Sequence, residues 1–305
     1  MIYKCENIVK KYDKKIVLNK LSFSITQNKV TCILGHNGSG KTTLIKSLLS
    51  LLLIDEGEIF FEGKNLKKYK EKDYYPKVSA VLEGNRNIYW YQTALENIYF
   101  FGYLKGLKKD DIKNKADRLL RVFDLYEQRN QKVSQYSRGM QQKLAIIISL
   151  LNDPLVLFLD EPTLGLDVVS KHNMIKILKE ISKSTTIVLT THQMDVVEKL
   201  AQNIILLDHG NILFDGDIKQ LKDKEKKDSL RMEVYDPKRI TAEIFKQNFI
   251  KQEGSISLID FKRDNFDFNE VDNTLRENGL ELINLKLKDN NIEDIFLKQG
   301  ENNDF

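Results

Sequence analysis

The stretch Gly35-His-Asn-Gly-Ser-Gly-Lys-Thr-Thr43 fits the pattern Gly-x4-Gly-Lys-[Ser/Thr] of a phosphate-binding loop. It follows an apolar run, Val30–Leu34, and precedes a helical pattern over Leu44–Ile54. Strand, glycine-rich loop and helix in this order form the context in which the motif binds nucleotide phosphates. Because glycines let successive backbone N–H groups turn inward, and because a helix N-terminus is partly positive, the loop predicts an anion site.

Two side chains of this loop have specific expected contacts. Lys41 is expected to reach the β- and γ-phosphates of a nucleotide, and the Thr42 hydroxyl is expected to ligate Mg²⁺. The other residues are expected to surround the phosphates; they are Gly35, His36, Asn37, Gly38, Ser39, Gly40 and Thr43. A chance match is the alternative, and the strand and helix on either side of the loop argue against it.

The composition is that of a globular protein with balanced charge. The 305 residues are 41% hydrophobic and 30% charged, which favours a packed core over disorder. The 48 basic and 44 acidic residues give a net charge of +4, so no nucleic-acid partner is expected. Cys5 and Cys32 lie in apolar runs, which indicates buried thiols rather than a disulfide framework.

No segment of the sequence predicts membrane insertion. The first residues, Met1–Asn7, precede no continuous apolar stretch and do not fit a signal peptide. The longest apolar runs, Leu48–Ile54 and Leu144–Leu151, are shorter than the roughly 20 residues that a spanning helix needs. We therefore expect a soluble chain that would act at a membrane only through another, membrane-spanning chain.

The apolar pattern predicts an α/β fold. Helical patterns over Val169–Ile181 and Met194–Leu200 separate apolar strands, so we expect a mostly parallel, helix-covered sheet with an N-terminal antiparallel β-subdomain. The predicted strands are Ile2–Val9, Ile16–Ile25, Val30–Leu34, Glu58–Phe61, Val78–Leu82, Leu155–Leu159, Thr186–Thr190 and Ile204–Leu207. We expect Ile204–Leu207 to be the last strand of the mostly parallel sheet.

From about residue 90 to 153 the pattern is helical and predicts an insertion into the sheet. Thr93-Ala-Leu-Glu96 fits a capping box, and Asp110–Leu125 carries the apolar stripe of an amphipathic helix. Ser137 precedes the helical pattern Arg138–Leu151 as a candidate N-cap.

The last part of the chain predicts a small α+β appendage behind a mixed-charge run at residues 219–228. We therefore expect two domains, residues 1–225 and 226–305. The predicted strands of the second domain are Leu230–Tyr235, Ser257–Phe261 and Leu282–Leu287, and its predicted helices are Ile240–Phe249 and Val271–Asn278.

Three further polar residues follow buried strands, where ligands bind in α/β sheets. Asp160 ends the strand Leu155–Leu159 and can hold Mg²⁺, and Glu161 can polarise an attacking water as general base. An ordinary Asp-Glu pair at a strand end is the alternative, which the phosphate loop disfavours. His192 follows the strand Thr186–Thr190 and is placed for a contact with a γ-phosphate.

A second anion site is predicted at Ser137 and Gly139, where a hydroxyl and a bare backbone precede a helix. One chain with two phosphate-binding ends suggests that two chains share their nucleotides.

Taken together, these motifs resemble the ATP-binding cassette (ABC) family over about residues 1–220. The match comprises Gly35–Thr43, Ser137–Gln141, Leu155–Glu161, Gly165–Asp167 and His192, in this order. The resemblance implies a head-to-tail pair of cassettes, with each ATP lying between the loop of one chain and the Ser137–Met140 segment of the other.

The resemblance also implies roles for single residues. Glu161 would be the hydrolytic base, His192 the γ-phosphate switch and Asp167 a contact across the dimer. Within the second anion site, the implied nucleotide contacts are Ser137, Gly139, Met140 and Gln141. Tyr12 stands where the family places an aromatic residue that stacks on adenine, although it also fits a plain strand-edge tyrosine.

Two positions depart from the family pattern. The common Leu-Ser-Gly-Gly-Gln signature is here Tyr136-Ser-Arg-Gly-Met140, which keeps the Ser137 and Gly139 that would face phosphate. Glu83 replaces the usual glutamine of the loop before the helical insertion, and its carboxylate can help to organise Mg²⁺ and the attacking water.

Both departures, with the segments Arg86–Trp90 and Asn291–Phe296, resemble a bacterial subfamily that powers small separate permeases. Its members commonly export drugs, peptides or bacteriocins, or give self-immunity. The resemblance implies an ATPase at the inner face of the cell membrane, bound to a permease and paired with a like or unlike cassette. Aromatic residues would either contact the permease or fill the insertion's own core; they are Tyr89, Trp90, Tyr91, Tyr99, Phe100, Phe101 and Tyr103.

A soluble ABC ATPase acting on the ribosome or on nucleic acid is the alternative function. Ribosome-bound relatives usually carry two cassettes in one chain, and this chain has one phosphate loop. Chromosome-maintenance relatives need long heptad repeats and excision-repair relatives need cysteine-rich zinc modules, and neither pattern is present here. A small-molecule P-loop kinase would lack the Ser137–Gln141 signature.

Overall fold

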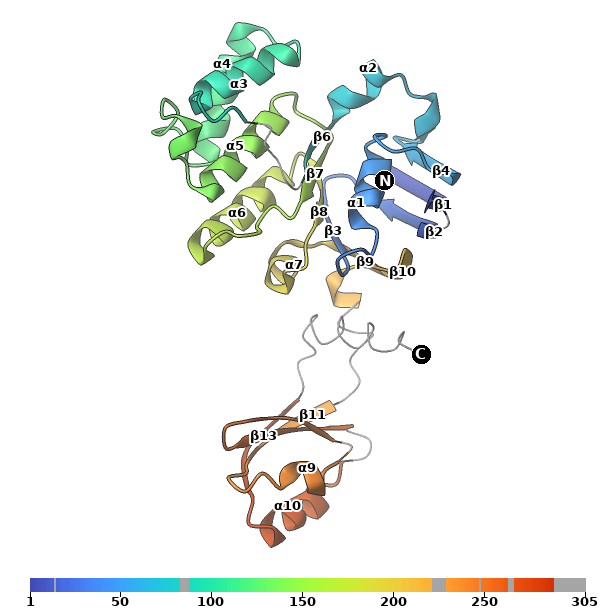
Figure 1. The fold of residues 1–305 in the computed structure, drawn as a ribbon, viewed down its shortest axis with the longest axis vertical. Helices are drawn as coiled ribbons and strands as arrows, with labels where there is room; N and C mark the ends of the chain where they lie inside the picture. Colours follow the sequence, from blue (N-terminus) through green and yellow to red (C-terminus); the bar gives the residue numbers. More distant parts are fainter. Residues whose placement is uncertain (14, 83–87, 221–228, 247, 263–265, 288–305) are drawn as a thin grey trace. The chain divides into compact units, whose positions relative to one another are not determined.

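The structure is a computed structural model that describes residues 1–13, 15–82, 88–220, 229–246, 248–262 and 266–287 (Figure 1). It divides into two compact units, residues 1–218 and 219–305. Glu83, which we predicted to help organise Mg²⁺, and the segment at 291–296 lie outside the described residues. No helix among the described residues is long and apolar enough to cross a membrane.

The first unit is built around a sheet of order β10-β9-β3-β8-β7-β6. All neighbouring strands from β9 to β6 are parallel, which confirms the predicted α/β class. The strands are β3 (Val30–Leu34), β6 (Val78–Val81), β7 (Val156–Asp160), β8 (Thr186–Thr190), β9 (Asn203–Asp208) and β10 (Asn211–Gly216).

The prediction that Ile204–Leu207 would end this sheet is wrong. β10 returns antiparallel to β9 through a turn at His209 and Gly210, both of which have positive φ. We missed β10 because, at the sheet edge, most of its residues stay partly exposed and give no apolar run.

A second, antiparallel sheet of order β2-β1-β4-β5 covers one side of the first. Leu44, Ile45 and Leu48 of helix α1 pack between the two sheets in one apolar core. The strands are β1 (Tyr3–Tyr12), β2 (Lys15–Ile25), β4 (Glu56–Phe61) and β5 (Lys64–Asn65), and α1 spans Lys41–Leu48. β1 pairs with β2, whereas β3 pairs with β8 and β9 in the parallel sheet.

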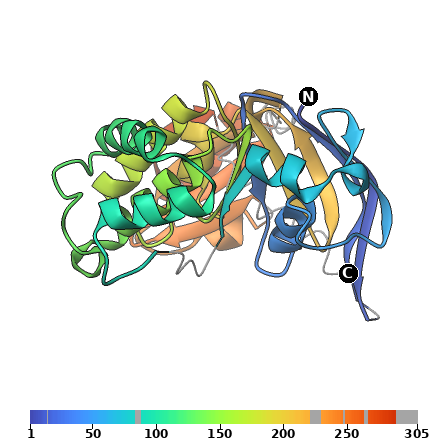
Figure 2. The same cartoon turned by 90° about the horizontal axis from the view of Figure 1, so that it is seen from above.

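Helices cover the opposite side of the parallel sheet (Figures 1 and 2). Thr93 and Glu96 form the predicted capping box, with N···O distances of 3.1 and 2.7 Å. The Ser137 hydroxyl accepts a hydrogen bond from the backbone N–H of Met140 at 3.2 Å, which confirms the predicted N-cap. The helices are α3 (Ala94–Leu104), α4 (Lys109–Val122), α5 (Arg138–Leu150), α6 (Val168–Ile181) and α7 (Met194–Leu200).

Between β5 and β6 the chain makes three short turns of helix, η1 (Leu66–Lys68), α2 (Glu71–Tyr74) and η2 (Tyr75–Lys77), and η3 (Val133–Gln135) precedes α5.

The second unit is a β-α-β-β-α-β arrangement with an antiparallel sheet of order β12-β13-β11-β14. This is the ferredoxin-like topology. Its buried core is Met232, Val234, Ile259, Phe261, Val271, Leu275 and Leu280. The elements are β11 (Ser229–Tyr235), α9 (Thr241–Ile244), β12 (Phe249–Glu253), β13 (Ile256–Lys262), α10 (Phe268–Glu277) and β14 (Glu281–Leu287).

The prediction of a helix over Ile240–Phe249 is wrong beyond Ile244, where the helix ends. The Asp236 carboxylate accepts hydrogen bonds from the backbone N–H groups of Ile240 and Thr241, so a helix begins there. It ends after Ile244, and Phe249 begins β12 by pairing with Ile259 of β13. Pairing across the sheet outweighs the local helical pattern.

Lys105, at the end of α3, gives a pH-dependent stability prediction. Burial, and then the charge of Lys115, lower the Lys105 pKa from 10.5 to about 8. The folded protein therefore binds fewer protons than the unfolded chain between these two pH values. The partly buried Lys105 charge therefore lowers the free energy of unfolding fully below about pH 8. This loss of stability shrinks as the pH rises from about 8 to 10.5.

We expect Lys105→Met to raise the free energy of unfolding at pH 7 by about 1–3 kcal/mol, an advantage that disappears by about pH 10.5. Urea unfolding of the wild type and of Lys105→Met at several pH values measures this difference in the free energy of unfolding. The exposed Lys113→Met of α4 is the matched control. An advantage that stays constant with pH would contradict the account.

Candidate nucleotide-binding site

The loop from Gly35 to Gly40 joins β3 to the N-terminus of α1. Gly38 and Gly40 have φ values of 86° and 108°, a region that side chains with a Cβ disfavour. The backbone N–H of Ser39 donates to the carbonyl of His36 at 3.2 Å, and Leu44 donates to the carbonyl of Gly40 at 2.8 Å. The loop therefore closes into a tight turn that leads straight into the helix.

Close packing also requires glycine in this loop. A Cβ on Gly35 would lie 2.3 Å from the Ser39 Oγ and 2.4 Å from the carbonyl oxygen of Leu207 in β9. A Cβ on Gly40 would lie 2.8 Å from the carbonyl oxygen of Val17 in β2. The loop is thus enclosed by β2, β9 and its own backbone.

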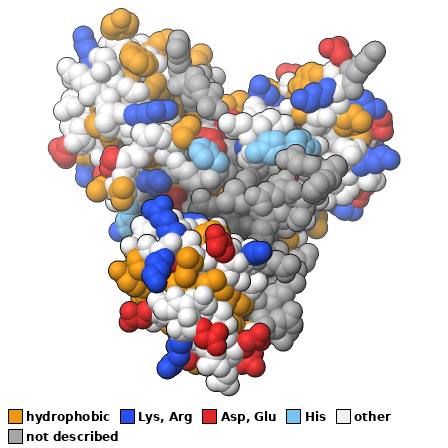
Figure 3. Space-filling model, turned by 60° about the horizontal axis from the view of Figure 1, so that its bottom comes forward, with side chains coloured by type: hydrophobic (Ala, Val, Ile, Leu, Met, Phe, Trp, Pro, Cys, Tyr) orange, Lys and Arg blue, Asp and Glu red, His pale blue; other side chains and the backbone are white. Residues whose placement is uncertain are grey.

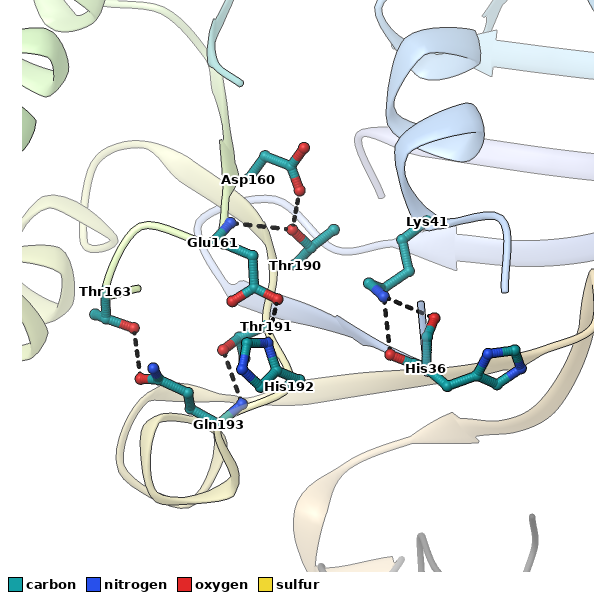
Figure 4. A network of polar contacts seen from close by, with 10 residues as sticks. His36, Lys41, Asp160, Glu161, Thr163, Thr190, Thr191, His192 and Gln193 are labelled. Carbon is teal, nitrogen blue, oxygen red and sulfur yellow. Dashed lines mark hydrogen bonds and ion pairs between the residues drawn. The ribbon is translucent and has the colours of Figure 1, made fainter. Parts of the chain in front are cut away.

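An open pocket of about 320 Å³ lies at the mouth of this loop. The Lys41 Nζ donates hydrogen bonds to the carbonyl oxygens of Gly35 at 2.8 Å and His36 at 3.0 Å (Figure 4). The pocket lining is Val17, Asn37, Gly38, Gly40, Lys41, Thr42, Thr43, Asp160, Glu161, Leu164 and His192.

The sheet register brings the acidic residues to this pocket. Asp160 ends β7 opposite Thr190, which ends β8. The Thr190 hydroxyl donates a hydrogen bond to the Asp160 carboxylate, and its oxygen accepts one from the Glu161 backbone N–H at 3.2 Å. Glu161 has φ of 48°, an uncommon conformation for a residue other than glycine. Such backbone conformations cluster at functional sites.

Glu161 and His192 form a pair inside the pocket. The His192 Nδ1 lies 2.8 Å from the Glu161 Oε1 (Figure 4). The other carboxylate oxygen, Oε2, is buried without a hydrogen-bond partner among the described residues. A buried acceptor without a partner is costly unless a donor such as water or a ligand reaches it. Glu161 therefore lines the pocket with one carboxylate oxygen held by His192 and one buried oxygen that no described donor reaches.

Gln193, the residue after His192, makes two hydrogen bonds that sequence reasoning did not predict. The Thr163 hydroxyl donates to the Gln193 Oε1 at 3.0 Å, and the Gln193 backbone N–H donates to the Thr191 hydroxyl at 3.0 Å (Figure 4). These hydroxyl and amide residues link the turns after β7 and β8. Val17 and Leu164 also line the pocket unpredicted, and no local sequence pattern marks either of them.

Several predicted residues do not line this pocket. Gly35, His36 and Ser39 belong to the loop but are not among the residues that line the pocket. Tyr12, at the end of β1, is 47% exposed, with the Lys10 Nζ 5.6 Å from the centre of its ring. The residues of the second anion site and Asp167 also lie outside the lining; they are Ser137, Gly139, Met140, Gln141 and Asp167.

The segment predicted to form the second anion site makes hydrogen bonds of its own. The Gln141 amide donates to the carbonyl oxygen of Tyr136 at 3.2 Å and thereby fixes the turn before α5. Asp167 caps α6 by accepting from the Ser170 backbone N–H at 2.9 Å. Hydrogen bonds from the Ser170 side chain and backbone lower the Asp167 pKa, so this carboxylate stays ionised.

The model of the ABC transporter family matches residues 18–164. The ABC transporter ATP-binding protein NatA of Bacillus subtilis is 31% identical to this chain over 220 residues, which are 71% of this chain and 89% of NatA. The chain belongs to the ABC transporter ATP-binding family. It is therefore an ATP-binding, ATP-hydrolysing subunit of a transporter.

Other ABC proteins resemble the chain in full length or in fold. The bacitracin transport ATP-binding protein BcrA of Enterococcus faecalis is 29% identical and aligns over 97% of this chain and 96% of BcrA. The structure of cbiO1 from Clostridium perfringens, part of the transporter complex cbiONQ, superposes with a TM-score of 0.68 at 28% identity. It covers 74% of this chain and 91% of cbiO1.

The two positive-φ glycines of the ABC phosphate loop give a matched prediction. Gly40→Ala adds both backbone strain and a clash with Val17, whereas a Cβ on Gly38 meets nothing within 4 Å. We expect Gly40→Ala to lose about 1–3 kcal/mol more stability than Gly38→Ala and to bind ATP far more weakly. Thermal unfolding and ATP titration of both variants measure this. Equal losses would show that packing does not constrain the loop.

Proposed function

We propose that the chain is the ATPase of an exporter, bound at the cytoplasmic face of the membrane to a separate permease and paired with a second cassette. The observation that carries the proposal is the alignment with two bacitracin transport ATP-binding proteins, which includes the C-terminal unit. Both alignments span 97% of this chain and 96% of the relative.

The pocket residues fit a nucleotide with Mg²⁺. Loop N–H groups and Lys41 supply positive charge for phosphates, and the Thr42 hydroxyl with the Asp160 carboxylate supplies the hard oxygens that Mg²⁺ prefers. Glu83 would assist in organising Mg²⁺. When bound, Mg²⁺ would neutralise charge on the β- and γ-phosphates. Tyr12 would stack on adenine at the exposed end of β1.

In this proposal Glu161 is the base of hydrolysis. Its unpartnered Oε2 would accept a proton from the attacking water, while His192 on Oε1 fixes the carboxylate and senses the γ-phosphate. Lys41 would leave the two loop carbonyls to which it now donates and contact the phosphates instead.

The second cassette would complete the site. Ser137, Gly139, Met140 and Gln141 lie outside the chain's own pocket, so a second copy or a related chain would present them to the nucleotide. Asp167 would contact the partner from the N-terminus of α6. The post-hydrolysis structure of the cassette MJ0796, described as dimeric with ADP and phosphate, is 25% identical with a TM-score of 0.63.

The transported molecule would be an antibiotic of the kind that the names of the relatives indicate. Besides the bacitracin proteins, the linearmycin resistance protein LnrL of Bacillus subtilis is 32% identical over 216 residues.

We divide the chain into an ATPase domain at 1–225, with helical subdomain 90–153, and an accessory domain at 226–305. The accessory domain would be shared with the bacitracin-type relatives.

Glu161→Gln tests the base assignment. Glutamine keeps the size and one acceptor but cannot take the proton, so we expect ATP binding to persist while hydrolysis falls about 100- to 10,000-fold. Phosphate release and ATP binding by filtration measure the two quantities. Glu198→Gln in α7 is the matched control outside the pocket. Turnover at the wild-type rate would refute the assignment.

Exposed aromatic residues before α3 are the proposed permease contact. Trp90 and Tyr91 are 50% and 88% exposed, and Tyr89 is 48% exposed, but the Tyr89 ring also packs on Phe100 with ring centres 4.9 Å apart. Trp90 and Tyr91 therefore fit an interface, whereas Tyr89 also contributes to the subdomain's own packing. We expect Trp90→Ala with Tyr91→Ala to abolish transport and permease binding but to leave ATP binding intact.

A pull-down of tagged Glu161→Gln protein with ATP from solubilised native membranes checks this prediction. A multispanning protein should be recovered in stoichiometric amount, lost with the Trp90/Tyr91 variant and retained with Tyr75→Ala, an exposed tyrosine elsewhere. Ribosomal or DNA-associated proteins without a membrane protein would instead support the soluble ATPase alternative. Retention of the permease by the Trp90/Tyr91 variant would refute this contact surface.

A further inference from the structure

Three potential metal ligands meet where the phosphate loop lies beside the β9–β10 turn, and none of them lines the nucleotide pocket. His36 follows β3 in the loop, Asp208 ends β9, and His209 begins the turn to β10. β3 and β9 are adjacent parallel strands, so their ends lie together. The Asp208 Oδ1 lies 2.8 Å from the His36 Nε2 and 3.8 Å from the His209 Nε2, and one ligand atom from each residue lies within 4.8 Å of the others.

Both ring nitrogens of His36 face oxygen atoms. Nδ1 lies 2.7 Å from the carbonyl oxygen of Asn37, and Nε2 lies 2.8 Å from the Asp208 carboxylate. A neutral imidazole carries a single N–H, so one nitrogen would direct its lone pair at an oxygen. That arrangement is repulsive unless a proton or a metal cation lies between the two atoms.

The contact at Nδ1 favours a metal. Histidine ligands commonly donate their second ring N–H to a backbone carbonyl, which fixes the tautomer and directs the other nitrogen to the ion. His36 has this carbonyl partner in Asn37, and its Nε2 lies against the Asp208 carboxylate, with the His209 ligand atom within 4.8 Å.

We propose that His36, Asp208 and His209 bind a divalent transition-metal ion of the zinc type. Zinc is held at about 2.0–2.1 Å in tetrahedral sites, so its ligand atoms lie about 3.3 Å apart. The two separations from Asp208, 2.8 and 3.8 Å, bracket that value. Three protein ligands leave a fourth position for water.

The site is open to solvent and the two thiols do not compete with it. The His36 and His209 side chains are 42% and 72% exposed, and histidine side chains are visible at the surface in Figure 3. Cys5 and Cys32 are buried, and burial raises the pKa of both thiols, so the thiolate form that binds zinc is suppressed.

A bound ion would restrain the phosphate loop. The carbonyl of His36 accepts from the Lys41 Nζ at 3.0 Å, and the Gly210 backbone N–H donates to the carbonyl of Ser39 at 3.1 Å. Fixing the His36 ring to His209 would therefore clamp the loop to the β9–β10 turn. The metal would act as an inhibitor of ATP turnover from outside the nucleotide pocket.

Zinc titration of untagged, nucleotide-free protein tests the proposal, with saturating Mg²⁺ to occupy the hard-oxygen ligands of the pocket. Calorimetry should show one saturable zinc ion per chain. His209→Gln should weaken its binding about tenfold or more, and His172→Gln, an exposed histidine on α6, should leave it unchanged.

The functional arm uses the same variants, because His209 does not line the nucleotide pocket. Without zinc, His209→Gln and wild type should hydrolyse ATP equally. With zinc, turnover should fall in wild type and in His172→Gln but not in His209→Gln. Unchanged zinc affinity in His209→Gln would overturn the site, and equal inhibition of both variants would overturn the clamp.

Discussion

The absence of space around the phosphate loop is the constraint on which the site depends. A Cβ at Gly35 would overlap both Ser39 and the backbone of β9, and a Cβ at Gly40 would approach the backbone of β2. At these two positions the loop can pass only as bare backbone, and it leads into α1 beside the pocket that Gly38, Gly40 and Lys41 line. The packing that excludes side chains thus shapes the proposed anion site.

Strand register places the proposed catalytic groups at the same pocket as that loop. Asp160 and Thr190 end adjacent parallel strands in register, and the Thr190 hydroxyl contacts both the Asp160 carboxylate and the Glu161 backbone. Glu161 and His192 then follow these two strands and meet at 2.8 Å. The Thr190 hydroxyl therefore connects the register of β7 and β8 to the positions of Asp160 and Glu161, which we propose to act in hydrolysis. Val17 closes the same pocket from the antiparallel sheet.

The helix caps and buried strands that a single segment determines could be predicted from the sequence. The capping box at Thr93, the N-cap at Ser137 and the buried strand Thr186–Thr190 involve only neighbouring residues or a continuous apolar run. Features that depend on pairing were missed, because β10 and β12 are edge strands whose residues are mostly exposed or partly exposed. The Gln193–Thr163 contact and the His36–Asp208–His209 cluster join segments that only the strand order brings together.

The central claim is that each ATP site is shared by two chains, and mixing two inactive variants tests it most directly. Lys41→Ala disables the pocket. Ser137→Asp keeps a residue that caps helices well but places a negative charge where phosphate would bind. Each variant alone should be inactive, whereas a mixture can form one site from an intact pocket and an intact Ser137 and should regain part of the wild-type ATPase rate. No recovery on mixing, or full activity of Ser137→Asp alone, would contradict the account.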